Sequence, residues 1–566
     1  MSDKNDFFVE IVDYIKNKKP KKQELSNTKI KLSKKYNLKK IPTDIDILLN
    51  CNNDDLNFIK EYVITKPSRT KSGVAVVAIM SYPYPCPHGE CDMCSSLTDE
   101  KIPQSYTGKE PATMRGIRND YNPYLQVMNR LEQYIVLGHK PEKVELIVMG
   151  GTFISFDKEY IENFINSAFK AMNDFSDMFY IKNENNKTIF NLKKFKEFFL
   201  LPGDIYNKDR HKKITTALLK KEKENYKNLE TEQFRNENSF IKCVGLTIET
   251  RPDYGKLKHG NLMLKLGCTR VELGVQTVYD DILETINRGH TIKDSIESTK
   301  ILKNLGFKLN YHIMPGLPNV TLKKDLDAFK ELFENQDFRP DMLKIYPCMV
   351  LKNSKLFEKW KKGLFTPLNT KNAVNLINEF KKYVPKYVRI MRVQRDIPSK
   401  VIEAGVDSTN LRQFIDKEKK CKCIRCREIG KLNFKKNEIS KLKFKTHTFS
   451  YNASFGKEYF ISIEDELKNC LIGFIRMRFP SEFLREEITK DSAIIRELHI
   501  YGDLASIGIS GEFQHTGFGS KLMKKAEDIA KENNKNKMIV ISGVGVRNYY
   551  KKLGYKKEGP YMVKLI

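Results

Sequence analysis

Residues 84–94 read Tyr-Pro-Cys-Pro-His-Gly-Glu-Cys-Asp-Met-Cys. The three cysteines, Cys86, Cys91 and Cys94, follow the spacing C-x4-C-x2-C directly after a strand-like apolar run. Three thiolates on one loop can bind three irons of a 4Fe–4S cluster and leave the fourth iron open. An open iron is what reductive cleavage of S-adenosylmethionine requires, because the methionine amino and carboxylate groups chelate it. A zinc ion is the alternative, with His88 as its fourth ligand.

The cysteine loop lies in a region where β-branched apolar runs alternate with amphipathic helical stretches. Such alternation is typical of a parallel α/β sheet or barrel. Six or seven units of this kind predict a partial (βα)6-type radical-SAM barrel over residues 71–396. Residues 173–242 depart from the alternation and are rich in Lys and Asn, so we interpret them as an insertion on the barrel surface. The apolar runs are residues 74–80, 144–151, 243–250, 270–276, 308–316, 342–348 and 387–393.

Two further groups of residues follow strand ends and are expected at the barrel rim, where active sites of such barrels lie. Gly150, Gly151 and Thr152 end the second apolar run, and glycines there let backbone approach the methionine part of a bound ligand. Glu249 suits ribose hydroxyl groups and Arg251 suits a carboxylate. A plain ion pair at the rim is the alternative for either residue.

The C-terminal residues 441–566 predict a second α/β domain of the GNAT-like acetyltransferase type. Residues 514–519 read Gln-His-Thr-Gly-Phe-Gly and precede an expected helix over Ser520–Asn533. This matches the pattern Q/R-x-x-G-x-G/A, a turn whose backbone N–H groups bind the pyrophosphate of coenzyme A at a helix N-terminus. Strand-like segments on both sides, residues 496–501 and 537–543, support a site for acetyl-CoA.

Two tyrosines of the C-terminal domain are catalytic candidates. Tyr549 and Tyr550 open the helix that follows the second of these strands. A tyrosine at that place can protonate the departing CoA thiolate, or it can simply pack in the core.

A second cysteine group lies between the two domains, in a charged linker over residues 397–440. Cys421, Cys423 and Cys426 have the spacing C-x-C-x2-C, and three thiolates so close together repel one another unless a metal binds them. We predict a structural zinc, with His447, Cys348 or water as the fourth ligand. An iron–sulfur cluster is the alternative.

The chain is strongly basic, with a formal net charge of +29. Such a charge predicts a polyanionic partner, unless it reflects a general compositional bias. Residues 1–70 are helical in pattern and rich in lysine, so we expect a basic N-terminal arm that binds tRNA. A solvated terminal extension is the alternative.

The sequence has neither a signal-peptide pattern nor an apolar run long enough to span a membrane. We therefore expect a cytoplasmic protein that does not bind a membrane. Its eleven cysteines are then expected to be metal ligands or buried thiols rather than disulfides.

Taken together, these motifs resemble the catalytic subunit of Elongator, in its single-chain form that acts without the other Elongator subunits. The resemblance covers about residues 65–566 except for the insertion, and includes Gly-Leu-Thr-Ile-Glu-Thr-Arg-Pro-Asp at 245–253. Further matching segments are residues 72–78, 104–108, 110–118, 149–153, 271–276, 288–291, 343–347, 393–398 and 559–564.

The resemblance implies formation of 5-carboxymethyluridine at the wobble position of tRNA. A 5′-deoxyadenosyl radical from S-adenosylmethionine would take hydrogen from the methyl group of acetyl-CoA, and the carbon radical would add to carbon 5 of the uridine. The resemblance also implies that Lys344 contacts substrate. The residues it implies for acetyl-CoA are Lys143, Glu497, Leu498, His499, Ile500, Phe518, Gly519, Ser520 and Tyr550.

The chain departs from the family pattern after the third cysteine. Cys-Pro-Gly-Gly in relatives is Cys94-Ser-Ser-Leu here, Met93 replaces an aromatic residue, and Gly255 stands where relatives carry Cys. None of these changes removes a cluster ligand.

The alternative functions are a protein lysine acetyltransferase that uses only the C-terminal domain, and a tRNA-binding scaffold with a degenerate cluster site. A homodimer is compatible with the sequence.

Overall fold

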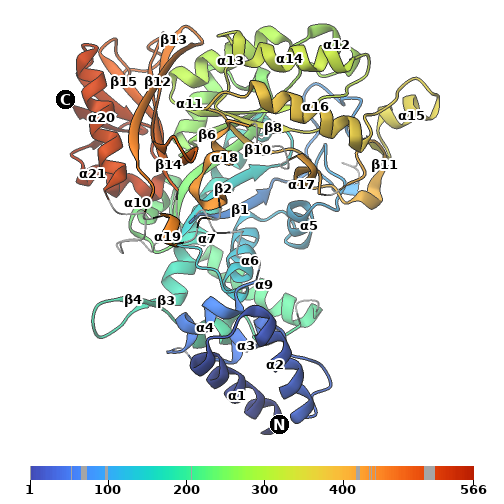
Figure 1. Ribbon diagram of the computed structural model, residues 1–566, viewed down its shortest axis with the longest axis vertical. Coiled ribbons are helices and arrows are strands. Elements are labelled where there is room, and N and C mark those ends of the chain that lie inside the picture. The colour runs from blue at the N-terminus through green and yellow to red at the C-terminus, as the bar shows by residue number, and fades with distance from the viewer. Residues whose placement is uncertain are drawn as a thin grey trace. The chain divides into compact units, whose positions relative to one another are not determined.

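The computed structural model describes residues 2–52, 54–65, 70, 73–95, 100–204, 207–408, 410–415, 421–432, 434, 436–439, 441–501 and 517–566 (Figure 1). The chain forms two compact units. The first contains residues 1–77, 124–144 and 166–242, and the second contains residues 78–123, 145–165 and 243–566. No helix in the described part of the chain is long and apolar enough to cross a membrane.

The first unit is mostly helical and joins the basic N-terminal segment to residues 173–242. Aromatic side chains make up part of its core, with the rings of Phe179 and Phe195 in a T-shaped contact at 5.4 Å. The segment interpreted as an insertion, residues 173–242, thus contributes regular helices and a hairpin to this unit. The helices are α1 (Ser2–Lys18), α2 (Lys22–Lys35), α3 (Asp44–Asn50), α4 (Leu56–Val63), α6 (Pro123–Val136), most of α7 (Lys158–Phe179), α8 (Leu192–Phe198), α9 (Lys208–Lys223) and α10 (Leu229–Asn238). The hairpin consists of β3 (Tyr180–Lys182) and β4 (Thr188–Phe190).

A seven-stranded sheet with the order β1-β2-β5-β6-β7-β8-β10 confirms the expected barrel. The neighbouring pairs from β5 to β10 are parallel. The strands are β1 (Ala75–Met80), β2 (Lys143–Met149), β5 (Lys242–Thr250), β6 (Arg270–Gln276), β7 (Lys308–Ile313), β8 (Met342–Ile345) and β10 (Arg389–Arg392). The helices between them include α5 (Pro111–Arg118), α11 (Leu257–Lys265), α12 (Asp280–Thr285), α13 (Ile292–Asn304), α14 (Leu322–Glu334) and α16 (Thr370–Tyr383).

Short elements lie between strands β8 and β10 and after β10. Strands β9 (Val350–Leu351) and β11 (Ile402–Ala404) pair antiparallel. Four short helices belong to this region: α15 (Lys355–Lys361), α17 (Leu411–Ile415), α18 (Ile424–Arg427) and α19 (Lys436–Ile439).

The C-terminal residues form a second seven-stranded sheet, with the order β12-β13-β14-β15-β16-β18-β17. All neighbouring strands are antiparallel except β15 and β16, which are parallel. Helix α20 begins two residues before the helix expected from the glycine motif. The elements are β12 (Lys445–Ala453), β13 (Gly456–Asp465), β14 (Cys470–Phe479), β15 (Ser492–Ile500), α20 (Phe518–Glu532), β16 (Lys537–Val540), α21 (Arg547–Lys552), β17 (Lys556–Glu558) and β18 (Tyr561–Leu565).

Buried charges join the C-terminal sheet to the barrel within the second unit. Arg496 of β15 is fully buried and donates two hydrogen bonds to Asp341, at 2.7 and 2.5 Å, directly before strand β8. Glu458 of β13 accepts further hydrogen bonds from Arg496 and Arg478 at 2.9 Å each. Burial alone would raise the pKa of Asp341, but Arg496 and Lys303 hold that pKa far below its usual range. The barrel and the C-terminal sheet are therefore connected by buried ion pairs, in which each charge is stabilised by a partner of opposite sign.

Candidate active site

The cysteine loop follows strand β1 and places two of its three thiols in buried positions. Cys91 and Cys94 are buried and Cys86 is half-buried. The Arg288 guanidinium donates to the Cys91 sulfur at 3.4 Å. A hydrogen bond from Cys94 and the positive charge of Arg288 lower the pKa of Cys91 to about 6. Burial raises the pKa of Cys86, and the hydrogen bond with Cys91 together with burial raises the pKa of Cys94. Of the three cysteines, Cys91 is therefore the one for which the surroundings favour the thiolate, the form that binds metal.

The spacing of these sulfur atoms discriminates between the two metal groups expected from the sequence. Four ligands around one zinc ion place neighbouring sulfurs about 3.8 Å apart, from the Zn–S bond length and tetrahedral geometry. Within the described residues, Cys86, Cys91 and Cys94 do not form a set with all sulfurs within 4.8 Å of one another. A cluster binds each thiolate to a different iron and tolerates wider spacing. The residues present thus fit a 4Fe–4S cluster better than a single zinc ion.

A glycine pair brings backbone close to the cysteine loop. Gly150 and Gly151 have φ angles of 124° and 81°, which disfavour any residue with a Cβ. A Cβ on Gly150 would lie 2.1 Å from the Ser81 hydroxyl oxygen, and one on Gly151 would lie 3.8 Å from the Cys86 sulfur. The Thr152 hydroxyl is also 3.8 Å from that sulfur. The glycines are therefore required for the close approach of this backbone to Ser81 and Cys86. Residues 96–99, which include part of the altered loop, lie outside the described residues.

Arg251 is buried at the rim with one nitrogen still available. Its Nε and Nη2 donate to the Asp253 carboxylate at 2.9 Å each, and Nη2 also donates to the Gly289 carbonyl at 2.9 Å. Its Nη1 is buried without a hydrogen-bond partner among the described residues. Arg251 therefore forms the ion pair at the rim that was the alternative to ligand binding, and its partner is Asp253. The remaining Nη1 can still donate to a ligand carboxylate.

Glu249 joins a cluster of charged residues inside the barrel rather than pairing with Arg251. The Lys344 ammonium contacts both Glu249, at 3.1 Å, and Glu272. His312 bonds the same Glu272 carboxylate at 2.9 Å, and Tyr106 donates to Glu249 at 3.2 Å. Although burial alone would raise the pKa of Glu272, Lys344 and His312 hold it well below its usual range. The oxygen and nitrogen atoms of Glu249, Glu272 and His312 lie within 4.8 Å of one another, but Lys344 already supplies the cation that this group needs.

Glu272 and His312 were missed by sequence reasoning. A charged residue inside the apolar strand β6 was the available signal, because Arg270, Glu272 and Gly274 alternate onto one face. Their partners come from the neighbouring strands β7 and β8, which the sequence does not place beside β6.

Strand β15 presents an open edge in the C-terminal sheet. Ser492–Ile495 pair with β16, but no strand in the described part of the chain pairs with residues 497–500 on that side. Such a diverging edge leaves backbone N–H and C=O groups that can pair with the pantetheine chain of a ligand. Glu497, Leu498, His499 and Ile500, all expected to contact acetyl-CoA, form this segment.

The glycine turn lies at the start of helix α20. Gly517 adopts φ 89°, and a Cβ on Gly519 would lie 2.7 Å from the Tyr549 hydroxyl. Tyr549 is 37% exposed, whereas Tyr550 is 6% exposed and packs against Tyr549 with ring centres 5.2 Å apart. Of the two tyrosines, Tyr549 therefore faces the turn and Tyr550 lies in the core. Residues 514–516 of the motif lie outside the described residues.

The second cysteine group is compact. The sulfurs of Cys421, Cys423 and Cys426 lie within 4.8 Å of one another, which fits three ligands of one zinc ion. Neither suggested protein ligand joins them: Cys348 packs in an apolar cluster with Cys91 and Cys94, and His447 contacts Glu466 at 3.4 Å. Helix α18, which contains Cys426, connects to the barrel through the hydrogen bond from the Ile424 N–H to the Val388 carbonyl at 2.9 Å.

Lys143 is the first residue of strand β2 and belongs to the first unit. It is half-buried, and burial lowers the pKa of its ammonium group. Its contact with acetyl-CoA stays a prediction.

Family models match most of the chain. The radical SAM superfamily model matches residues 83–332, and the radical SAM C-terminal domain model matches residues 340–420. The GNAT acetyltransferase family matches residues 431–555, and the ELP3 N-terminal domain matches residues 6–71. Elongator complex protein 3 of Saccharomyces cerevisiae is 39% identical over 99% of this chain and 95% of its own length. The chain belongs to the Elongator complex protein 3 family.

Two archaeal relatives have similar levels of identity to this chain, 42% and 39%. The tRNA uridine(34) acetyltransferase of Methanocaldococcus jannaschii is 42% identical over 93% of this chain and 90% of its own length. The solved structure of Methanocaldococcus infernus Elp3, which has an N-terminal deletion, aligns with a TM-score of 0.69. It is 39% identical and covers 88% of this chain and 100% of its own chain.

Proposed function

We propose that this protein modifies uridine 34 of tRNA, forming 5-carboxymethyluridine from acetyl-CoA and S-adenosylmethionine. The observation that carries the proposal is the presence, in one compact unit, of a cysteine loop suited to a 4Fe–4S cluster and an acetyltransferase sheet with an open edge. A lysine acetyltransferase would have no use for the first of these sites. The archaeal relative named for uridine 34 supports the substrate.

Each group of residues has a separate task in this proposal. When bound, the cluster supplies the electron that cleaves S-adenosylmethionine to a 5′-deoxyadenosyl radical. Arg251 orients the methionine carboxylate through Nη1, and the backbone of Gly150 and Gly151, which lies close to Cys86, contacts the same part of the molecule. The segment 497–500 and the first residues of helix α20, Phe518–Ser520, hold acetyl-CoA. Tyr549, at the glycine turn, donates a proton to the CoA thiolate when the thioester is hydrolysed.

We assign structural zinc to Cys421, Cys423 and Cys426, with water as the fourth ligand. Zinc there stabilises the connection between strand β10 and the C-terminal sheet. Close to it, Arg389 of β10 contacts Glu428 at 2.5 Å and the Tyr501 hydroxyl at 2.8 Å.

A direct assay tests the function. Anaerobically reconstituted protein receives S-adenosylmethionine, dithionite, acetyl-CoA and tRNA, and the nucleosides are analysed by mass after digestion. We expect 5-carboxymethyluridine and 5′-deoxyadenosine, both dependent on acetyl-CoA. Absence of both products from protein with a full complement of iron would contradict the proposal.

Lys344 is proposed to contact the uracil carbonyl, because its ammonium lies at the end of strand β8 between two carboxylates. Replacing Lys344→Met removes that donor, and we expect modified nucleoside formation to fall about 100-fold or more, as for loss of one oriented donor. Formation of 5′-deoxyadenosine should persist without the nucleoside product, and Lys344→Arg should restore part of the activity. Equal losses of both products, together with loss of iron, would assign Lys344 a structural role only.

A further inference from the structure

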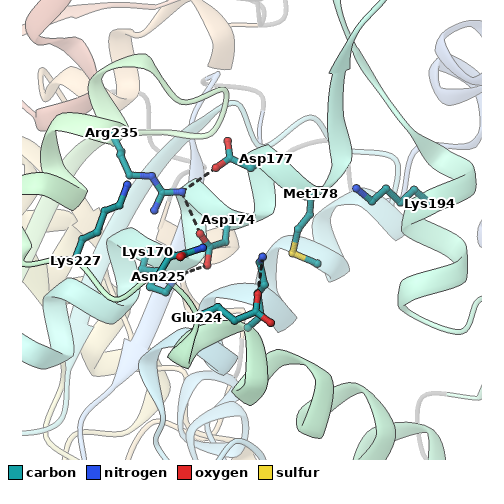
Figure 2. A pocket seen from close by; sticks show the side chains of 10 residues that line it. Lys170, Asp174, Asp177, Met178, Lys194, Glu224, Asn225, Lys227 and Arg235 are labelled. Atoms are coloured by element: carbon teal, nitrogen blue, oxygen red, sulfur yellow. Dashed lines mark hydrogen bonds and ion pairs between the residues drawn. The ribbon is translucent and has the colours of Figure 1, made fainter.

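A charged cavity lies in the first unit, and none of its lining residues has a role in the sites described above. It has a volume of about 490 Å³ and is formed by helices α7, α8, α9 and α10 with the connection before α10 (Figure 2). It lies almost entirely in the segment that the sequence did not explain. The lining residues are Lys170, Asp174, Asp177, Met178, Lys194, Lys221, Glu224, Asn225, Lys227 and Arg235.

The floor of the cavity is held rigidly by hydrogen bonds. Asp174 is 4% exposed and accepts from the Lys170 ammonium at 2.7 Å and from the Tyr124 hydroxyl at 3.0 Å. Arg235 reaches the same carboxylate at 3.1 Å and Asp177 at 2.8 Å, and it also bonds Glu232 at 2.8 Å. Figure 2 shows Arg235 and Asp174 facing each other across this floor. The cavity is therefore organised before any ligand arrives.

The cavity has an excess of positive charge. Its acids already have partners, since Asp174 and Asp177 pair with Arg235, and Glu224 pairs with Lys221 at 3.0 Å. Lys194 and Lys227 also line the cavity, and neither forms an ion pair in the part of the chain that the structure describes. Both are exposed to solvent. An anion with about two negative charges would balance these two ammonium groups.

The lining favours phosphate groups of a nucleic-acid backbone over a small organic molecule. Met178 is the sole apolar side chain of the ten lining residues, and none of them is aromatic, so the cavity offers little surface for a base or an acyl chain. Aromatic residues next to the cavity in sequence are instead open to solvent: Tyr226 is 66% exposed and Phe234 is 62% exposed. Exposed rings beside a cationic cavity suit RNA, because unpaired bases stack on them while the phosphates bind the lysines.

We propose that this cavity binds backbone phosphates of the tRNA substrate through Lys194 and Lys227, which extend from a floor of mutually paired charges that includes Lys170, Arg235 and Asp174. The proposal rests on tRNA being the substrate, as argued above. It assigns tRNA positioning to residues 170–235 in addition to the basic N-terminal helices of the same unit.

Charge reversal of the two exposed lysines tests the proposal in the full-length protein. We expect Lys194→Glu with Lys227→Glu to weaken equilibrium binding of tRNA tenfold or more at about 0.1 M salt, and to reduce the slope of log affinity against log salt by about 1 to 2. Lys182→Glu with Lys187→Glu, on the exposed β3–β4 hairpin, makes the same change in net charge and should cost clearly less affinity. Equal affinity of the two double variants would overturn the proposal.

Two further measurements separate the remaining outcomes. With wild-type turnover established, the cavity variant should show a raised KM for tRNA and a kcat close to wild type at saturating tRNA. If wild-type protein binds tRNA through the cavity but forms no modified nucleoside, the proposed reaction fails while the phosphate site stands. If inorganic phosphate raises the melting temperature of wild type but not of the cavity variant, and tRNA affinity is unchanged, the cavity is a free-phosphate site and the RNA assignment is wrong.

Discussion

Cys91→Ala is expected to abolish both 5′-deoxyadenosine and modified nucleoside formation while leaving tRNA affinity within about twofold of wild type. Cys91 is 1% exposed, and its thiol is the one whose pKa is lowered to about 6 by Cys94 and Arg288. Losing one of three thiolates leaves the cluster with too few protein ligands to hold three of its irons. Radical formation stops for that reason, whereas RNA binding depends on charges elsewhere.

Metal content provides the control for this prediction. Cys91→Ala protein should lose iron and keep about one zinc per chain, and Cys423→Ala protein should lose zinc and keep iron. Iron and zinc are measured on anaerobically reconstituted protein by elemental analysis. Cys91→Ala protein that retains iron and cleaves S-adenosylmethionine would contradict the assignment of the cysteine loop.

Asp341→Asn is expected to lower the free energy of unfolding of the second unit by about 3–5 kcal/mol, the usual cost of removing one partner from a buried ion pair. Asp341 is fully buried and accepts two hydrogen bonds from Arg496, and the Leu309 N–H donates to it at 2.9 Å. Asparagine keeps the shape but leaves the cations Arg496 and Lys303 without their main negative charge. Urea unfolding followed by the fluorescence of Trp360, the single tryptophan, measures the change.

A surface pair gives the matched control for Asp341. Asp528 contacts Lys524 at 3.7 Å on helix α20, and its side chain is 41% exposed. Asp528→Asn should change the free energy of unfolding by about 0.5 kcal/mol or less, because solvent screens such pairs. If Asp341→Asn costs no more than this control, the buried charges do not hold the barrel and the C-terminal sheet together.

The pH dependence of stability follows from the same carboxylate. The pKa of Asp341 in the folded protein lies far below its value in the unfolded chain, which is about 3.9. The ionised carboxylate therefore contributes fully to the free energy of unfolding at pH values above about 3.9. This stabilising contribution is lost progressively as the pH falls below about 3.9 toward the folded-state pKa. Asp341→Asn should therefore narrow the difference in stability between about pH 6 and pH 3.

The buried charges also link the two halves of the proposed reaction. Arg496 directly precedes the open segment 497–500 of strand β15, and Asp341 lies three residues before Lys344. Their hydrogen bonds therefore connect the strand that is proposed to hold acetyl-CoA with the strand that contains Lys344.

The sequence by itself determined the features that depend on local spacing. Three such features each lie within about a dozen consecutive residues: the cysteine loop, the glycine turn before helix α20, and the group of Cys421, Cys423 and Cys426. Their chemistry needs ligands on one loop or one turn, so spacing along the chain is enough to reveal them. The alternation of strands and helices likewise predicted the barrel and the C-terminal sheet, because apolar runs recur along the chain with amphipathic helical stretches between them.

The tertiary structure alone decided which distant residues meet. Glu272, His312 and Lys344 come from three adjacent strands, and their contacts depend on strand order and register, which no local pattern encodes. It also separated Tyr549 from Tyr550, which are neighbours in sequence but differ in burial because helix α21 turns one toward the glycine turn and the other into the core. The cavity around Lys194 and Lys227 was hidden for a third reason: a site made of charges from four helices has no apolar periodicity, and only packing brings those charges together.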